Sequence, residues 1–280
     1  MFQVPRLPFP AYALGLTLAF TFGVILVRRE ARRRGLSTTL VTDLCVHVIL
    51  VSIVGARLVH VVADGDAERY LQRCTTHTPA GCLAVLRFWE GGLVFYGGLA
   101  LALGYGWFFI RRHRLPFWRV LDLFALALPL GLTFGRLGCH FHGCCFGAPT
   151  DLAWGLRFPA GSDASWSQAA AGLLPTADHV SLPVHPTQLL SVALNLTIFA
   201  VLYGVVRRRQ RFDGELVCLF GLAYGVTRFG VELLRADPRG SVGPLSTSQL
   251  LSVVLVVAAA AAWSVLGRRQ VGESLRPKTG

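Results

Sequence analysis

The chain contains seven apolar runs that are each long enough to cross a lipid bilayer. A transmembrane helix needs ~20 mainly apolar residues, and only helices or closed barrels satisfy their own backbone polar groups in lipid. The sequence therefore predicts an all-α polytopic membrane protein with seven transmembrane helices. Their approximate ranges are 8–27, 41–63, 92–110, 120–137, 187–206, 215–235 and 248–266.

Arginine clusters follow every second apolar run, with the sequences RREARRR, RRHR, RRRQR and GRR. Cytoplasmic loops of membrane proteins are enriched in Lys and Arg, so we expect these clusters on the cytoplasmic side. The N-terminus is then outside and the C-terminus inside. This orientation leaves two external segments, 64–91 and 138–186, and a cytoplasmic tail, 267–280.

The net charge of +12 raises the question of a nucleic-acid partner. The arginines stand in short turns beside apolar runs, where they favour the surface of a membrane over nucleic acid. A retinal pigment is also excluded, because the only lysine, Lys278, lies in the tail and cannot form a Schiff base inside a helix.

Ionisable residues inside the predicted spans are the strongest indication of a functional site. Such residues are costly in lipid and usually face a cavity or the interior of a bundle. Arg57 and Arg136 lie in the second and fourth spans, and the sixth holds Arg228, Glu232 and Arg235. The last three are spaced i, i+4, i+7, which places them on one helix face. They form either an internal ion-pair ladder or a pocket for an anion such as a lipid phosphate, which arginine binds bidentately.

The segment GRLGCHFHGCCFG, residues 135–147, begins the second external segment and is rich in thiols and imidazoles. A zinc site has enough ligands here, but the spacing is unlike the usual zinc motifs. A disulfide, a local structural role or histidine chemistry are the other interpretations, and we expect no metal. The five side chains concerned are Cys139, His140, His142, Cys144 and Cys145.

Two further pairs of cysteines have simpler interpretations. Cys74 and Cys82 share the first external segment and could pair with each other. Cys45 and Cys218 lie within predicted spans, where cysteine behaves as a small apolar residue.

Five segments resemble motifs of the prolipoprotein diacylglyceryl transferases, a family of seven-span enzymes of the bacterial inner membrane. FWEGGLVFYGGL resembles the family's W-D/E-G-G-x-x-x-H-G-G-L, and GRLGCHFHGCCFG resembles its signature G-R-x-G-N-F-x-N-x-E-x-x-G. HPTQL, YGVTRFGVELLRADP and LSTSQLLSV resemble three further family segments. The five occur in the family's order and extend along most of the chain.

The resemblance implies a single transmembrane transferase domain, residues 1–280, that moves a diacylglyceryl group from phosphatidylglycerol to the lipobox cysteine of a prolipoprotein. Its partners are then these two substrates and membrane lipids. No cofactor is expected, because the lipid carries its own leaving group. Arg136 would bind the lipid phosphate, and Arg228 would stabilise the departing phosphate, held in place by Glu232 and Arg235. The other residues implied in substrate binding are Arg57, Gly97, Gly98, Gly138, Cys139, Gly147, His185, Gln188 and Tyr224.

The sequence departs from the family pattern at the proposed base and in the signature. Tyr96 stands where the family has a histidine, and Cys139, His142 and Cys144 replace two asparagines and a glutamate. Tyrosine, with a usual pKa near 10, is a poor base at neutral pH, so His140 or His142 is expected to replace it. The alternatives are a diverged member with another lipid or thiol acceptor, a non-catalytic seven-span lipid-binding protein, or a transporter.

Overall fold

A computed structural model describes residues 2–5, 11–63, 94–235 and 241–274. The described chain is mainly α-helical and forms two compact units, one of residues 1–27 and 118–280 and the other of residues 28–117. The expected external segment 64–91, with Cys74 and Cys82, lies outside the described residues.

Each of the seven predicted spans coincides with a helix. These helices are α1 (Ala11–Arg33), α2 (Thr38–Ala63), α5 (Phe95–Arg112), α6 (Phe117–His142), α8 (Thr187–Gly204), α9 (Glu215–Glu232) and α10 (Thr247–Ser274). Within the described residues, five stretches are long and apolar enough to cross a membrane: Ala11–Arg33, Thr38–Val62, Phe117–His142, Thr187–Arg208 and Thr247–Arg268. The prediction of an all-α polytopic membrane protein is therefore confirmed, whereas α5 and α9 do not meet this criterion. Helix α9 carries three charged residues, and α5 contains several glycines and ends with two arginines.

Three helix ends differ from the expected limits of the spans. Helix α6 continues to His142 and stops at Gly143, whose positive φ of 85° ends the helix, so the segment 138–186 begins inside a helix. Helix α10 continues to Ser274, into the predicted tail. Helix α9 ends at Glu232, so Arg235 lies beyond it rather than on the shared helix face.

In the unit of residues 28–117, α2 and α5 pack antiparallel through glycines. A Cβ atom on Gly97 would lie 2.5 Å from the carbonyl oxygen of Gly55, and one on Gly98 would lie 2.7 Å from that of Ser52. Only residues without a side chain permit this approach of two backbones, which is a common way for helices to associate in membranes. Gly97 and Gly98 are thus fixed by helix packing.

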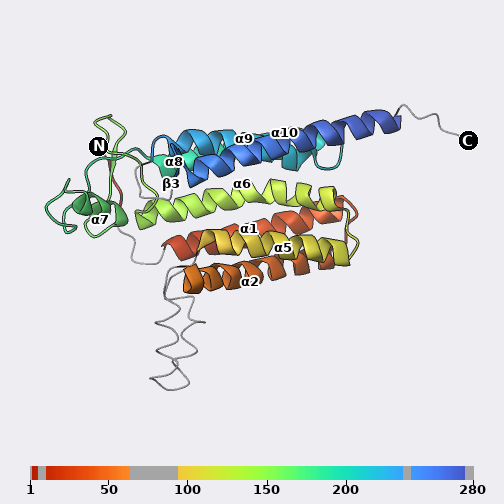
Figure 1. The fold of residues 1–280 in the computed structure, drawn as a ribbon, viewed down its shortest axis with the longest axis horizontal. Coiled ribbons are helices and arrows are strands. Elements are labelled where there is room, and N and C mark those ends of the chain that lie inside the picture. The colour runs from red at the N-terminus through yellow and green to blue at the C-terminus, as the bar shows by residue number, and fades with distance from the viewer. Residues whose placement is uncertain (1, 6–10, 64–93, 236–240, 275–280) are drawn as a thin grey trace, which may run out of the picture. The chain divides into compact units, whose positions relative to one another are not determined.

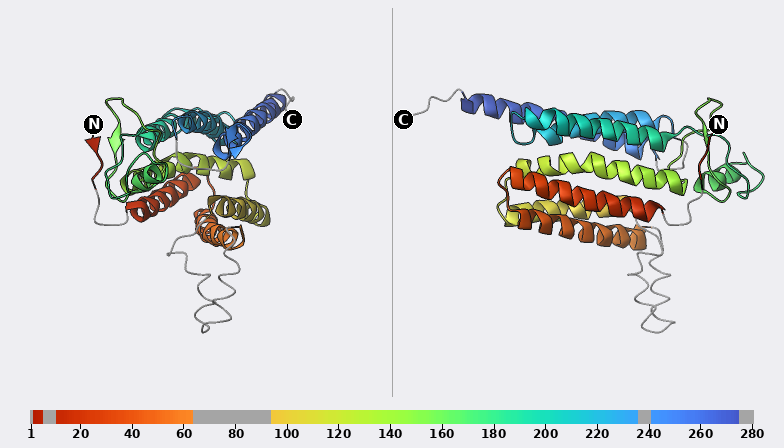
Figure 2. Two further views of the ribbon diagram at one scale, coloured as in Figure 1. Left: turned by 60° about the vertical axis from the view of Figure 1, so that its left-hand side comes forward. Right: turned by 180° about the vertical axis from the view of Figure 1, so that it is seen from behind.

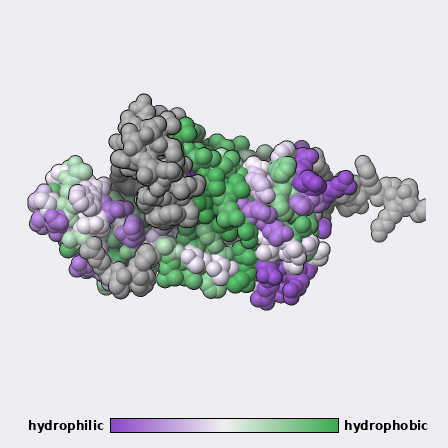
Figure 3. Space-filling view, turned by 90° about the horizontal axis from the view of Figure 1, so that it is seen from below, coloured by the Kyte–Doolittle hydropathy of each residue, from purple (hydrophilic) through white to green (hydrophobic). Residues whose placement is uncertain are grey.

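In the other unit, α6, α8, α9 and α10 run side by side (Figure 1). Gly15 of α1 approaches the Phe134 carbonyl oxygen of α6, where a Cβ atom would be 2.7 Å away, and the rings of Phe22 and Phe134 stack at 5.2 Å. Gly225 of α9 lies against Val256 of α10, at 2.5 Å from an added Cβ. Along the helices visible in Figure 3, hydrophobic residues form a broad band, as expected for helices surrounded by lipid.

The residues between α6 and α8 form a small folded body at one end of these helices (Figure 2). Strand β1 (Phe2–Gln3) pairs in parallel with β2 (Leu156–Arg157), and helix α7 (Asp163–Ala170) is capped by the Ser162 side chain. The body has its own apolar core, made of Val4, Phe146, Leu156, Phe158, Ala164 and Val184. Strands β3 (Ser241–Val242) and β4 (Leu245–Ser246) form a hairpin that leads into α10.

At the other end of α6, the fully buried Asp122 holds the connection from α8 to α9, which includes the 3₁₀ helix η3 (Val206–Arg208). Its carboxylate accepts hydrogen bonds from Gln210 Nε2 at 2.6 Å, from Gly214 N at 2.8 Å and from Val217 N at 3.0 Å. A buried carboxylate with three donors fixes the start of α9 relative to α6. The sequence analysis did not single out this residue, although it lies within a predicted span.

We predict that Asp122→Ala destabilises the protein by about 2–5 kcal/mol, because it leaves buried backbone N–H groups without an acceptor. Asp213→Ala is the matched control, since Asp213 forms an exposed ion pair with Arg119 and should cost about 0–1 kcal/mol. Thermal unfolding in detergent would measure both, and equal losses would contradict the structural role of Asp122.

Candidate active site

The end of α9 presents a buried ion pair. Arg228 NH1 lies 2.6 Å from Glu232 Oε2, with side chains 11% and 5% exposed. Arg228 also donates through NH2 to Ser248 Oγ at 2.8 Å, and Glu232 Oε1 accepts from Ser246 Oγ at 3.0 Å. The first turn of α10 and the strand before it thus fix both partners of the ion pair.

Arg235 joins this pair from the turn that follows α9. Its Nε lies 3.8 Å from Glu232 Oε2, and its backbone pairs with that of Gly147. The predicted trio is therefore brought together, but by the chain's turn after Glu232 and not by i, i+7 spacing on one helix.

Arg136 lies in α6, near enough to Arg228 for their charges to interact. Its positive charge acts on Arg228 together with that of Arg235, while Glu232 is the carboxylate that acts in the opposite sense. Arg228 and Arg235 thus contact Glu232, and the charge of Arg136 acts on Arg228. Positive charge that exceeds the negative charge in this way attracts anions. Tyr224, one turn before Arg228, also interacts electrostatically with it.

The loop after α6 is clamped to the start of α8. Thr187 Oγ1 donates to the carbonyl oxygen of Cys145 at 2.9 Å, and Gln188 Nε2 donates to that of Cys144 at 2.8 Å. Both donors are buried, and α8 begins directly after Pro186. Gln188, implied in substrate binding by the resemblance, therefore contacts the backbone of this loop.

Gly147 lies in the same loop, between the segments that contain His185 and Leu234. Its N–H donates to the His185 carbonyl oxygen at 3.2 Å, and Ala148 N–H donates to that of Leu234 at 2.8 Å. A Cβ atom on Gly147 would lie 2.6 Å from His185 Cβ, so only glycine fits between these segments. Gly138 similarly faces the backbone of Tyr12, with an added Cβ at 3.1 Å.

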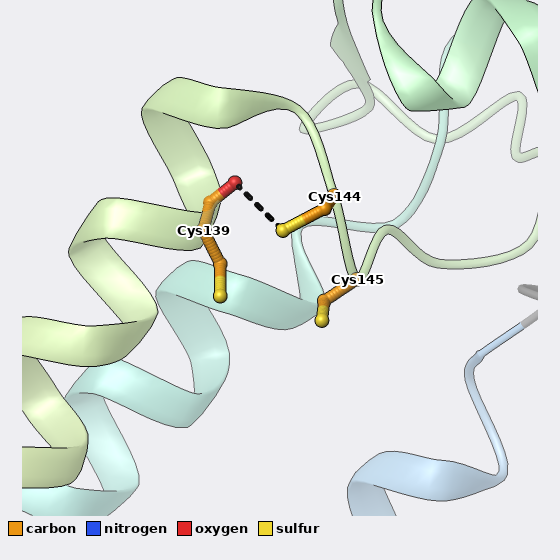
Figure 4. Close-up of side chains that lie close together, drawn as sticks. All are labelled: Cys139, Cys144 and Cys145. Atoms are coloured by element: carbon orange, nitrogen blue, oxygen red, sulfur yellow. Dashed lines mark hydrogen bonds between the residues drawn. The ribbon is translucent and has the colours of Figure 1, made fainter. Parts of the chain in front are cut away.

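Three thiols, one at the end of α6 and two in the loop, lie close together (Figure 4). The sulfur atoms of Cys139, Cys144 and Cys145 all lie within 4.8 Å of one another, and all three cysteines are free thiols. Cys144 Sγ donates to the Cys139 carbonyl oxygen at 3.8 Å. A disulfide, one of the four interpretations of this segment, is therefore not formed in this structure.

The three thiols differ in acidity. Hydrogen bonding with the Cys139 and Cys144 side chains lowers the pKa of Cys145, and the positive charges of Arg235 and Arg136 lower it further. Hydrogen bonding with Cys139 and Cys145, together with burial, raises the pKa of Cys144. Cys145 is thus the thiol of this pair that is more readily ionised.

The two histidines of the segment have different surroundings. His140 is buried, its ring makes an edge contact with Phe158 at 6.1 Å, and its Nδ1 has no hydrogen-bond partner among the described residues. His142 is exposed at the end of α6, with its ring 6.2 Å from that of Tyr12.

The remaining candidate residues lie in the unit of residues 28–117. Arg57 is buried in α2, and Tyr96 is 45% exposed in the first turn of α5. Both make interactions within the described structure.

Sequence reasoning missed Ser246 and Ser248, which bond Glu232 and Arg228. Both stand in LSTSQLLSV, a segment noted for its resemblance but given no role. Their position in the chain, shortly after the span that carries Arg228 and Glu232, could have indicated this role, because serine hydroxyls can form hydrogen bonds with buried charged groups.

Comparisons with known proteins identify the family of the chain. A family model for prolipoprotein diacylglyceryl transferase matches residues 1–265. A phosphatidylglycerol–prolipoprotein diacylglyceryl transferase of Geobacter sulfurreducens is 32% identical over 277 residues, covering 97% of this chain and 96% of that protein. One of the same name from Gloeobacter violaceus is 33% identical over 261 residues, covering 92% and 88%. The chain belongs to the prolipoprotein diacylglyceryl transferase family.

Proposed function

We propose that this protein transfers a diacylglyceryl group from phosphatidylglycerol to the lipobox cysteine thiol of prolipoproteins. The observation that carries the proposal is the group of arginines near Glu232: Arg228 and Arg235 contact its carboxylate, and the charge of Arg136 acts on Arg228. Relatives that cover nearly the whole chain bear the name of this activity.

The reaction forms a carbon–sulfur bond and breaks a carbon–oxygen bond. The thiol sulfur attacks the carbon of the diacylglyceryl group that carries the phosphate oxygen, and glycerol phosphate leaves with the electron pair. Arg136 binds the lipid phosphate, and Arg228 stabilises the negative charge of the departing phosphate. Glu232 and the serine hydroxyls hold Arg228 in place, since its side chain is fixed by Glu232 and Ser248.

We also propose substrate-binding roles for the other residues that the family resemblance implies. Of these, the structure supports a framework role for the glycines, which are fixed by close backbone contacts. Arg57 of α2 belongs to this set, as do Tyr224, one turn before Arg228, and His185, whose carbonyl oxygen accepts from Gly147 N–H. The remaining members of this set are Gly97, Gly98, Gly138, Cys139 and Gln188.

We propose that seven helices cross the bacterial inner membrane, with the N-terminus outside and the C-terminus inside. The 18 residues of α5 and of α9 extend about 27 Å at 1.5 Å per residue, close to the ~30 Å hydrocarbon core. Arginine clusters follow α1, α5 and α8, which supports the orientation by the positive-inside rule. The candidate site then lies at the external ends of α6 and α9.

Alkaline phosphatase fused after Gly161 should be active, and the same enzyme fused after Gly35 should be inactive. The reporter needs disulfides, which form only outside the cytoplasm. Activity assays on whole cells would measure both fusions. Activity after Gly35 together with inactivity after Gly161 would reverse the proposed orientation.

Arg136→Ala and Arg228→Ala should each lower transfer by at least about 100-fold, the effect of removing one donor that stabilises transition-state charge. The assay mixes purified protein, phosphatidylglycerol and a lipobox peptide, and mass spectrometry detects the diacylglyceryl adduct. Arg119→Ala is the control, because Arg119 forms an exposed ion pair with Asp213. Full turnover by either pocket variant, in protein shown to be folded, would refute the phosphate-pocket assignment.

We propose that His140 or His142 accepts the thiol proton in place of the family histidine at the position of Tyr96. Loss of a general base typically slows a reaction by about 10²–10⁴-fold, so His140→Ala or His142→Ala should slow transfer to that extent. His179→Ala, which removes an exposed histidine bonded to Thr176, is the matched control. The same adduct assay decides: if both variants keep the wild-type rate, the base is another group.

A further inference from the structure

The three thiols beside the arginine pocket come from two elements that the fold brings together. Cys139 lies in the last turns of α6, and Cys144 and Cys145 lie in the loop that follows (Figure 4). Their sulfur atoms are all within 4.8 Å of one another. The sequence spacing alone did not favour a metal site, because it lacks the two separated pairs of the usual zinc motifs.

The distances suit a shared metal ion. A zinc–sulfur bond is ~2.3 Å long, so two sulfurs on one ion lie about 3.8–4.6 Å apart, depending on the bond angle. Sulfurs within 4.8 Å reach such an arrangement through small side-chain rotations. Thiolates select soft or borderline ions such as Zn²⁺ and Cu⁺.

The loop that carries two of the thiols is held in an unusual conformation. Cys145 has a positive φ of 60°, which is uncommon for any residue other than glycine. Buried hydrogen bonds from Thr187 and Gln188 to the Cys145 and Cys144 carbonyl oxygens maintain it. This conformation brings the sulfur of Cys145 toward that of Cys139 and is therefore part of what assembles the cluster.

The local charge also suits bound metal. Three thiolates and one Zn²⁺ carry a net charge of −1, which costs free energy in a partly buried place unless it is compensated. Positive charges of Arg235 and Arg136 already act on Cys145.

We propose that Cys139, Cys144 and Cys145 form a three-thiolate site for one thiophilic metal ion, Zn²⁺ or Cu⁺, which ties the loop after α6 to the end of that helix. Binding breaks three S–H bonds, forms three metal–sulfur bonds and releases three protons to solvent, with no change of oxidation state. The ion has a structural role beside Arg136 and takes no part in group transfer.

The test uses the full-length protein in detergent, stripped of metal and reduced, with its thiols counted. Zn²⁺ is titrated in competition with a chromophoric chelator, and Co²⁺ is added separately to detect thiolate-to-metal charge-transfer absorption. A parallel titration uses Cu⁺. We expect one equivalent of metal per chain, a thiolate charge-transfer band with Co²⁺, and a higher unfolding temperature with metal bound.

Serine variants locate the site. Cys139→Ser, Cys144→Ser and Cys145→Ser should each weaken binding by more than about 10-fold, since even the loss of an outer-shell partner has this effect. The control Cys45→Ala, Cys218→Ala removes two buried thiols on α2 and α9 and should bind normally. A second control, Cys74→Ser, Cys82→Ser, removes the remaining thiols of the chain and should also bind normally.

Two results would overturn the proposal. In the first, neither Zn²⁺ nor Cu⁺ binds stoichiometrically to protein whose thiols are shown to be reduced. The other is binding that survives all three serine variants, which would locate the metal elsewhere. Because binding and unfolding are measured without substrate, failure here leaves the transferase proposal intact.

Discussion

The buried ion pair between Arg228 and Glu232 is the interaction around which the candidate site is organised. Guanidinium groups that converge in a partly dehydrated place repel each other, and Glu232 is the carboxylate that offsets this repulsion. Removing one partner of a buried pair typically costs about 3–5 kcal/mol, because the other charge is left uncompensated. Glu232 therefore allows three arginines to gather while leaving enough positive charge to hold an anion.

Backbone contacts connect this ion pair to the loop after α6. Gly147 lies between His185 and Leu234 with no room for a side chain, and its backbone pairs with Arg235. The thiol-bearing loop, the start of α8 and the turn after α9 are thus one connected structure. A displacement of the loop would move Arg235, and with it the environment of Glu232.

The sequence predicted the helices because their apolar runs are long, and it predicted the arginine group because charges inside such runs are rare. It located the end of α9 incorrectly, since periodicity extends past Glu232 although the chain turns there. It gave no role to Asp122, whose three donors come from residues about ninety positions away along the chain. It grouped Cys139 with Cys145 in one segment but could not predict how close their sulfur atoms lie, because that distance depends on positive φ angles at Gly143 and Cys145. Contacts between residues that are distant along the chain, and unusual backbone angles, produce no periodic pattern in a sequence.

The hydrogen bonds that hold the loop after α6 do not depend on the side chains of the loop. Thr187 and Gln188 bond to the carbonyl oxygens of Cys145 and Cys144, not to their side chains. Other side chains at Cys144 and Cys145 would therefore leave these hydrogen bonds available. The side chains of the loop instead determine its chemistry, since the sulfur atoms of Cys144 and Cys145 lie close to that of Cys139. The arginines and the thiols can thus lie in adjacent places, because Arg228 and Arg235 are held by Glu232, whereas the thiols belong to side chains that the hydrogen bonds of the loop do not require.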